Sequence, residues 1–127
     1  MGHKAFTLVE LLIVVIILGI LAAVVIPQFS DASEDARLSS LTTNLQTIRG
    51  QIELYHIQYG VYPPEATFGT VMTTKGATFG PCLQSVPNNP YTNTSTVATT
   101  AVGTSAWKYE AATGNFSAND TAVHAAY

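Results

Sequence analysis

The chain is 127 residues long, carries a formal net charge of −3, and has 10% charged and 47% hydrophobic residues. This length allows one small domain plus an anchor and leaves no room for a second substantial core. A mildly acidic chain has few of the lysines and arginines that neutralise phosphates, so we expect no nucleic-acid partner. The one cysteine, Cys82, cannot form a disulfide within the chain and is expected to be a small buried residue.

An apolar run occupies residues 6–26, FTLVELLIVVIILGILAAVVI, and contains one charged residue, Glu10. At ~1.5 Å per residue, a helix of this length spans ~31 Å, which is the hydrocarbon thickness of a bilayer. Its aliphatic and aromatic residues favour insertion by about 5 to 10 kcal/mol, more than the roughly 3 kcal/mol that a carboxylate costs at mid-membrane. The run therefore predicts a membrane-spanning helix. Glu10 is a candidate functional residue because an acid is retained there at a cost.

Residues 4–27, KAFTLVELLIVVIILGILAAVVIP, combine a short basic leader, a Phe-Thr-Leu-x-Glu start and a long apolar stretch. This segment resembles the N-terminus of type IV pilins and of type II secretion pseudopilins. The resemblance implies that residues 1–5 are a leader, that a prepilin peptidase cuts between Ala5 and Phe6, and that the new amine of Phe6 is methylated. Where that family usually has glycine before the cut, this chain has Ala5.

The resemblance also implies a homo-oligomeric helical filament, extracellular or periplasmic, whose subunits are held in the inner membrane until pilus or secretion machinery assembles them. The charges at the start of the segment agree with assembly into such a filament. A cationic Phe6 amine would lie beside unpaired N–H groups at the positive end of the helix dipole. Two helices packed with an axial offset could place Glu10 of one chain against the Phe6 amine of the next, which relieves two desolvated charges. We therefore expect Phe6 and Glu10 to set the register of assembly.

Two simpler interpretations of the apolar run stay open. It could be a secretory signal with a cut near Ala23, although it is long for one, Glu10 interrupts it and no clean Ala-x-Ala site follows. It could also be a plain single-span anchor. The ordered combination of leader, motif, acid and apolar run favours the pilin-like interpretation.

Gly19 and Pro27 are the candidate flexibility residues of this helix. Proline lacks an N–H and clashes with the carbonyl four residues back, and glycine weakens a helix by roughly 1 kcal/mol relative to alanine. A kink is the simplest consequence in a lone subunit. The resemblance implies a further one, that the segment from Gly19 to Pro27, at the end of the membrane-spanning and filament-core part of the helix (residues 6–27), unwinds when the subunit leaves the bilayer and packs in a filament.

Residues 28–60 are amphipathic, and their apolar side chains recur at spacings of three and four without a break. This pattern predicts that the helix continues to Tyr59, where Gly60 supplies a stop. A coiled coil between chains is the competing interpretation, and the strand-like sequence that follows favours burial against the chain's own head. We call this set the leucine–tyrosine stripe, and it consists of Leu38, Leu41, Leu45, Ile48, Ile52, Tyr55 and Tyr59.

Residues 61–127 are predicted to form a globular head. Its first part is rich in Gly, Pro, Thr and Asn and predicts loop with one short turn of helix. Strand character appears at residues 96–102 and 106–110, and a turn at residues 113–115 precedes another short strand. We expect three or four antiparallel strands laid across the second half of the helix, an α+β fold. Trp107, Tyr109 and Phe116 are the expected sheet-side partners of the stripe, with Ala106, Lys108 and Glu110 on the other face.

The sequence contains no catalytic constellation, no metal-ligand cluster and no cofactor motif, so we expect neither an enzyme nor a cofactor. Residues 83–91 resemble the segment that leads into the sheet of the major pseudopilin, but its acidic calcium-binding loop is not visible. The function predicted is therefore a structural filament subunit, of either a surface pilus or a secretion pseudopilus. The alternative is a monomeric membrane-anchored binding module whose head is a ligand receptor.

Overall fold

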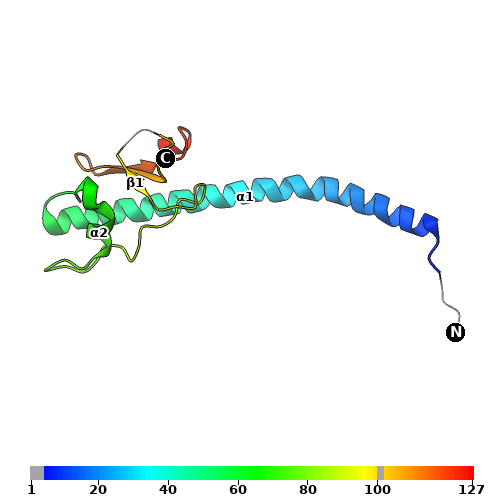
Figure 1. Cartoon of the computed structure of the whole chain (residues 1–127), viewed down its shortest axis with the longest axis horizontal. Helices are drawn as coiled ribbons and strands as arrows, with labels where there is room; N and C mark the ends of the chain where they lie inside the picture. The colour runs from blue at the N-terminus through cyan, green and yellow to red at the C-terminus, as the bar shows by residue number, and fades with distance from the viewer. Residues whose placement is uncertain (1–4, 100–101) are drawn as a thin grey trace. The chain divides into compact units, whose positions relative to one another are not determined.

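The computed structural model describes residues 5–99 and 102–127, except for the side chain of Pro27. Its principal element is helix α1, Leu8–Tyr59, whose 52 residues are followed by short helices and a small sheet (Figure 1). The chain divides into two compact units, with the boundary between Ala36 and Arg37. We describe the first unit, which holds the N-terminal part of α1, and then the second, which we call the head.

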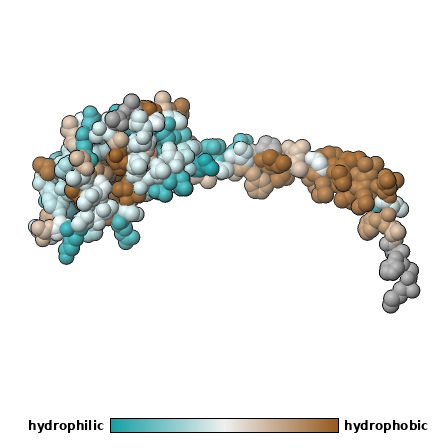
Figure 2. All heavy atoms as spheres, in the orientation of Figure 1, coloured by the Kyte–Doolittle hydropathy of each residue, from teal (hydrophilic) through white to brown (hydrophobic). Residues whose placement is uncertain are grey.

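The first unit is apolar and uncovered. Every side chain from Leu8 to Ile26 is exposed in the single chain, and brown, the colour of hydrophobic residues, gathers over this part in Figure 2. Within the described residues, α1 is the one helix long and apolar enough to cross a membrane, judged by length and composition. The assigned helix runs through Gly19 and Pro27 without interruption. Flexibility at these two residues stays a prediction.

The leucine–tyrosine stripe is confirmed as the face of α1 that the head covers. Leu41, Leu45, Ile48 and Ile52 are at most 1% exposed. Leu38 and Tyr55 are partly buried at the margins of the same core, and Tyr59 is 37% exposed at the end of the helix. Because the chain's own head buries this stripe, a coiled coil is not needed to explain it.

The end of α1 follows the expected stop signal. Gly60 has φ +73°, the left-handed conformation that glycine adopts without steric cost, and its N–H donates to the carbonyl of His56 at 2.8 Å. The chain then forms the 3-10 helix η1, Glu65–Thr67, and the short helix α2, Phe68–Thr73. Phe68 and Met72 of α2 are buried in the core, so the predicted helical turn in this region is confirmed.

The sheet has three strands in the order β1-β2-β3: Val97–Ala98, Trp107–Glu110 and Asn115–Ala118. Strands β2 and β3 are antiparallel, and Tyr109 is opposite Phe116. Strand β1 is parallel to β2, with Val97 opposite Trp107. The α+β class is therefore confirmed, and the expectation of a purely antiparallel sheet is wrong.

The short length of β1 explains the parallel pairing. A parallel neighbour normally requires a long crossover, because the chain must return along the whole strand. A strand of two residues spans only about 7 Å, so a short loop is enough to return the chain. That loop includes Gly103, which has φ +89° and donates its N–H to the carbonyl of Asn119 at 2.6 Å.

One face of β2 supplies the aromatic part of the core, as predicted. Trp107 and Tyr109 are at most 1% exposed, whereas Lys108 and Glu110, which alternate with them along the strand, are exposed. The ring of Tyr109 lies 4.4 Å from that of Phe68 in α2. Phe116 of β3 is also fully buried.

Ala106 does not lie on the outer face where we expected it, because it is only 1% exposed. It precedes the first residue of β2 and belongs to a polar junction instead. Its carbonyl accepts hydrogen bonds from the side chain of Asn89 at 2.9 Å and from the backbone N–H of Asn119 at 3.1 Å. These bonds draw Ala106 inward.

Candidate processing and assembly site

The helix start is organised by Thr7 and Glu10. The N–H of Thr7 donates to Oε2 of Glu10 at 2.8 Å, and the Thr7 hydroxyl donates to the same oxygen at 2.9 Å. In return, the N–H of Glu10 lies 3.2 Å from the Thr7 hydroxyl oxygen. This reciprocal arrangement is a capping box, which satisfies N–H groups that the first turn of a helix leaves without partners.

The capping box gives Glu10 a role that our sequence reasoning missed. The signal was present, because a threonine followed three residues later by glutamate before an apolar run is a known helix-start pattern. The first helical residue is accordingly Leu8. Glu10 is thus a cap within its own chain, whatever it contacts in an assembly.

The bond predicted for cleavage lies just outside the helix. Ala5, Phe6 and Thr7 have no regular secondary structure, and all three are exposed. Phe6 is 76% exposed. A protease needs an accessible substrate outside regular secondary structure, and residues 5–7 meet that requirement. Cleavage and methylation at Ala5 and Phe6 stay predictions.

Glu10 retains capacity for a further partner. A carboxylate can accept about four hydrogen bonds. Both bonds from Thr7 are accepted by Oε2, while Oε1 has no hydrogen bond to any residue within 5–99 or 102–127. An external cation such as the Phe6 amine of a second chain could therefore approach without displacing the cap. The structure contains one chain, so this pairing also stays a prediction.

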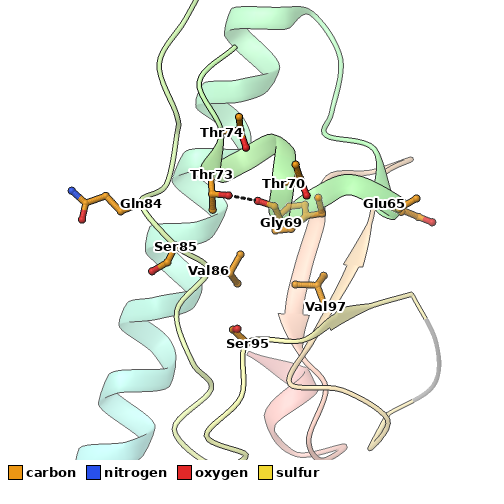
Figure 3. Close-up of a pocket in the computed structure, with 12 residues that line it drawn as sticks. Glu65, Gly69, Thr70, Thr73, Thr74, Gln84, Ser85, Val86, Ser95 and Val97 are labelled. Carbon is orange, nitrogen blue, oxygen red and sulfur yellow. Dashed lines mark hydrogen bonds between the residues drawn. The ribbon is translucent and has the colours of Figure 1, made fainter.

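A second candidate site is an open hollow in the head, with a volume of about 650 Å³ (Figure 3). It lies between α2 and the segments that carry Val86 and Val97. Its lining is neutral except for one residue and includes five hydroxyl-bearing side chains, of which that of Thr73 donates to the carbonyl of Gly69 at 2.8 Å. The one charged lining residue, Glu65, already accepts a hydrogen bond from the N–H of Ala111 at 3.0 Å.

The remaining reactive side chains, two histidines and one cysteine, pack against or pair with other side chains of the head. His56 stacks on Tyr62 with ring centroids 4.1 Å apart, and His124 pairs through Nδ1 with Asp120. Cys82 is partly rather than fully buried, and that burial raises the pKa of its thiol. Among the described residues, no three His, Cys, Asp or Glu side chains are grouped so that they could hold a metal ion.

Comparison with known proteins decides between the interpretations of the N-terminus. Residues 1–26 match the family model described as the prokaryotic N-terminal methylation motif. The chain carries a prepilin-type N-terminus. This match includes residues 1–5, Phe6 and Glu10, and the predicted recognition of the segment is confirmed.

The prepilin-type chain also has homologues beyond the motif. It is 34% identical over 72 residues to the type IV major pilin protein PilE of Neisseria gonorrhoeae, covering 57% of this chain and 43% of that protein. It is 36% identical over 61 residues to type II secretion system core protein G of Pseudomonas aeruginosa, covering 48% and 43%. It is 31% identical over 101 residues to the fimbrial protein EcpC of Eikenella corrodens, covering 79% and 66%.

The prepilin-type chain spans about half the length of the curated relatives it matches. No solved structure matches it. The relatives named above are a type IV major pilin, a fimbrial protein and a type II secretion system core protein. Together with the long apolar helix, this kinship supports anchoring in a membrane and a structural role in filaments.

Proposed function

We propose that this chain is the structural subunit of a helical filament, held in the inner membrane as a single-pass protein and polymerised through the N-terminal part of α1. The observation that carries the proposal is an exposed apolar helix that begins with a prepilin motif and retains one acid, Glu10. Such a helix is stable in lipid, where its apolar residues favour insertion by about 5 to 10 kcal/mol. Outside lipid it needs an equivalent apolar cover, and other copies of the same helix can provide one.

The proposal assigns successive roles to the first residues. A prepilin peptidase removes residues 1–5 by cutting between Ala5 and Phe6, and the new amine of Phe6 is methylated. Glu10 of an incoming subunit then pairs with the Phe6 amine of its neighbour, which sets the axial offset between helices. Removal of either partner would leave an uncompensated charge in an apolar interior, at a cost of several kcal/mol. No enzymatic activity is assigned to the chain itself.

The filament is either a surface pilus or a periplasmic pseudopilus that pushes secreted proteins outward, and assembly depends on the corresponding machinery. Kinship with pilins and with core protein G supports both. Sheared cell-surface material viewed by electron microscopy separates them, because only a pilus gives long extracellular fibres. A pseudopilus instead reveals itself when deletion of the gene blocks the release of secreted proteins.

A second candidate function is a monomeric membrane-anchored receptor, and the hollow beside α2 is the observation that favours it. Its open form and its neutral lining supply few of the convergent groups that a tight ligand site uses. A receptor also gives no reason for a prepilin motif. We therefore rank it below the filament subunit.

The decisive experiment compares Glu10→Ala with Thr7→Val in cells that contain the assembly machinery. Thr7→Val removes the hydroxyl of the capping box and leaves the carboxylate, whereas Glu10→Ala removes both the cap and the charge. We expect both variants to insert in the membrane and to be cleaved before Phe6, as measured by N-terminal mass analysis. Only Glu10→Ala should lose filaments. Normal filaments from Glu10→Ala would contradict the proposal.

A further inference from the structure

The two outer edges of the sheet differ in how they are closed. At the edge formed by β3, the backbone oxygen of Phe116 accepts a hydrogen bond from Nε of Arg49 at 2.8 Å, so α1 closes this edge. Strand β1 forms the other edge. The N–H and C=O groups along a sheet edge can pair with another chain unless they are covered. We therefore asked what covers the edge of β1.

The backbone groups of Val97 in β1 point away from β2. Val97 is opposite Trp107, and the N–H of Trp107 donates to the carbonyl of Thr96 at 3.0 Å. In a parallel pair, alternate residues of one strand form the bonds to its neighbour. Thr96 and Ala98 therefore bond towards β2, and the N–H and C=O of Val97 face the free edge. Outside the β-ladder, no hydrogen bond joins these two groups to residues 5–99 or 102–127.

An open space lies next to Val97. The hollow of about 650 Å³ and a second one of about 360 Å³ both have Val97, Glu65 and Ala66 in their linings. Across the larger hollow lies the irregular segment that carries Ser85 and Val86 (Figure 3). The N–H groups of these two residues likewise donate no hydrogen bond within the described part of the chain. The space is thus bordered on two sides by backbone that can accept a further strand.

Glu65 is the one charged residue that lines these two hollows. Its Oε1 accepts the hydrogen bond from the N–H of Ala111, whereas its Oε2 accepts none from residues 5–99 or 102–127. No basic side chain among these residues forms an ion pair with it. A carboxylate can accept about four hydrogen bonds, so Glu65 has room for a cation from outside the chain.

We propose that the free edge of β1 binds an extended peptide segment of another protein, which adds a strand beside Val97 and places a lysine or arginine at Glu65. In this mode of recognition the main-chain hydrogen bonds supply affinity and the side chains supply specificity. Strand β1 is only two residues long, so it offers few such bonds and the complex is weak and reversible. The proposal concerns the head alone and goes beyond the filament function.

Charge favours a foreign peptide over a second copy of the same edge. Residues 92–99, which include β1, contain no charged side chain. Two β1 edges paired with each other would therefore bring no cation from either strand to Glu65. A peptide with a basic residue supplies the missing charge, and its backbone supplies the partners for Val97.

A binding measurement on the full chain in detergent micelles tests the backbone part of the proposal. The probe is a fluorescein-labelled peptide, Thr-Val-Thr-Lys-Thr-Val-Thr, followed by fluorescence anisotropy. Val97→Pro removes the outward N–H and keeps the bonds to β2, because an edge strand accepts proline where the N–H faces solvent. Val97→Thr is the matched control and keeps the N–H. We expect the dissociation constant to rise at least fivefold with Val97→Pro and to stay within twofold with Val97→Thr.

A modified peptide keeps this test independent of folding. If thermal unfolding shows that Val97→Pro disturbs the head, the unmodified chain is titrated with the same peptide carrying N-methyl groups on its backbone, which cannot complete a strand. We expect binding at least fivefold weaker than that of the unmethylated peptide. Equal binding of the two peptides, or no saturable binding of the unmethylated one, would overturn the proposal.

Glu65→Gln tests the charge of the partner. Glutamine retains an oxygen that can accept from the N–H of Ala111 and loses the negative charge. We expect the lysine peptide to bind at least threefold more weakly to this variant. A peptide with glutamine in place of lysine should bind both proteins within twofold. Unchanged binding of the lysine peptide would overturn the assigned partner.

Sedimentation of the chain without peptide, in the same detergent, tests the other occupant. We expect no association that depends on Val97. Dimers that Val97→Pro abolishes would assign the free edge to a second copy and would overturn the proposal. None of these measurements requires a filament, so a negative result leaves the filament function untouched.

Discussion

The two parts of α1 differ in what covers them. In the head, Leu41, Leu45, Ile48 and Ile52 are buried by the chain's own short helix and sheet. In the first unit, residues 8–26 are more apolar still, and no described residue covers them. The same helical geometry therefore serves two kinds of burial, one completed by folding and one that requires lipid or other copies. Substitutions in the two parts should accordingly have separate effects.

The largest effect that separates the two parts is expected from Trp107→Ala. The side chain is fully buried, and its Nε1 donates to the carbonyl of Pro87 at 2.9 Å. Removing it should lower the free energy of unfolding of the head by about 3 to 5 kcal/mol. Ile16→Ala, in the first unit, should leave that free energy unchanged. Urea unfolding followed by circular dichroism measures both, and equal losses would refute the separation.

A smaller effect is expected from Arg49→Met. The guanidinium donates through Nε to a backbone oxygen of Phe116 in β3 and through Nη2 to a backbone oxygen of Tyr127, so it ties α1 to β3 and to the C-terminal segment of the head. Losing hydrogen bonds from a charged donor should cost about 1.5 to 3 kcal/mol. Arg37→Met, at an exposed position of the same helix, is the matched control and should change stability by less than about 0.5 kcal/mol.

The head should also lose stability in strong alkali because of Tyr109. Burial, followed by the negative charge of Glu65, raises the pKa of Tyr109 to about 12. The folded state thus holds the phenolic proton more tightly than the unfolded state, whose tyrosines titrate near 10. Stability is therefore fully present below pH 10 and falls as the pH rises from 10 towards 12.

Tyr109→Phe isolates this contribution. The variant loses the hydrogen bond that the hydroxyl donates to the carbonyl of Pro63 at 2.9 Å, which should cost about 1 kcal/mol at neutral pH. Its melting temperature should then fall less steeply between pH 10 and 12 than that of the unmodified chain. Parallel curves for the two proteins would exclude Tyr109 as the cause.

The smallest effect on the head is expected from Gly19→Ala. This substitution tests instead whether Gly19 makes the helix of the first unit flexible. No side chain lies within 4 Å of the position that a Cβ would take in the single chain, so the substitution meets no obstacle there. It should stabilise the local helix by roughly 1 kcal/mol and leave the unfolding of the head unchanged. If Gly19 permits unwinding, filaments of this variant should extend less under load in optical tweezers. Equal extension would remove Gly19 from the flexibility residues.

The sequence was most informative where periodicity was strong. The stripe from Leu41 to Ile52 and the alternation of Trp107 and Tyr109 follow from the repeats of 3.6 and 2 residues, and both are confirmed. Strand β1 could not be predicted in the same way. Two residues, Val97 and Ala98, contain no alternation from which direction or register could be read.

The polar junction of the head was also beyond sequence reasoning. The buried side chain of Asn89 donates to the carbonyl of Ala106 and to Oδ1 of Asp120, and its own Oδ1 accepts from the N–H of Tyr91. These partners lie up to 31 positions away in the chain. An asparagine next to proline predicts a turn, and only the folded state shows that it joins three segments. In the candidate site, by contrast, Phe6 and Glu10 could be named from the motif alone.

The capping box has a consequence for maturation. Its three hydrogen bonds involve only Thr7 and Glu10. A cut between Ala5 and Phe6 breaks none of them, because the N–H of Thr7 belongs to the next peptide bond. Maturation would thus leave the helix start intact and change only its electrostatics, by creating a positive charge one residue ahead of the cap. The subunit would become competent to pair without any refolding.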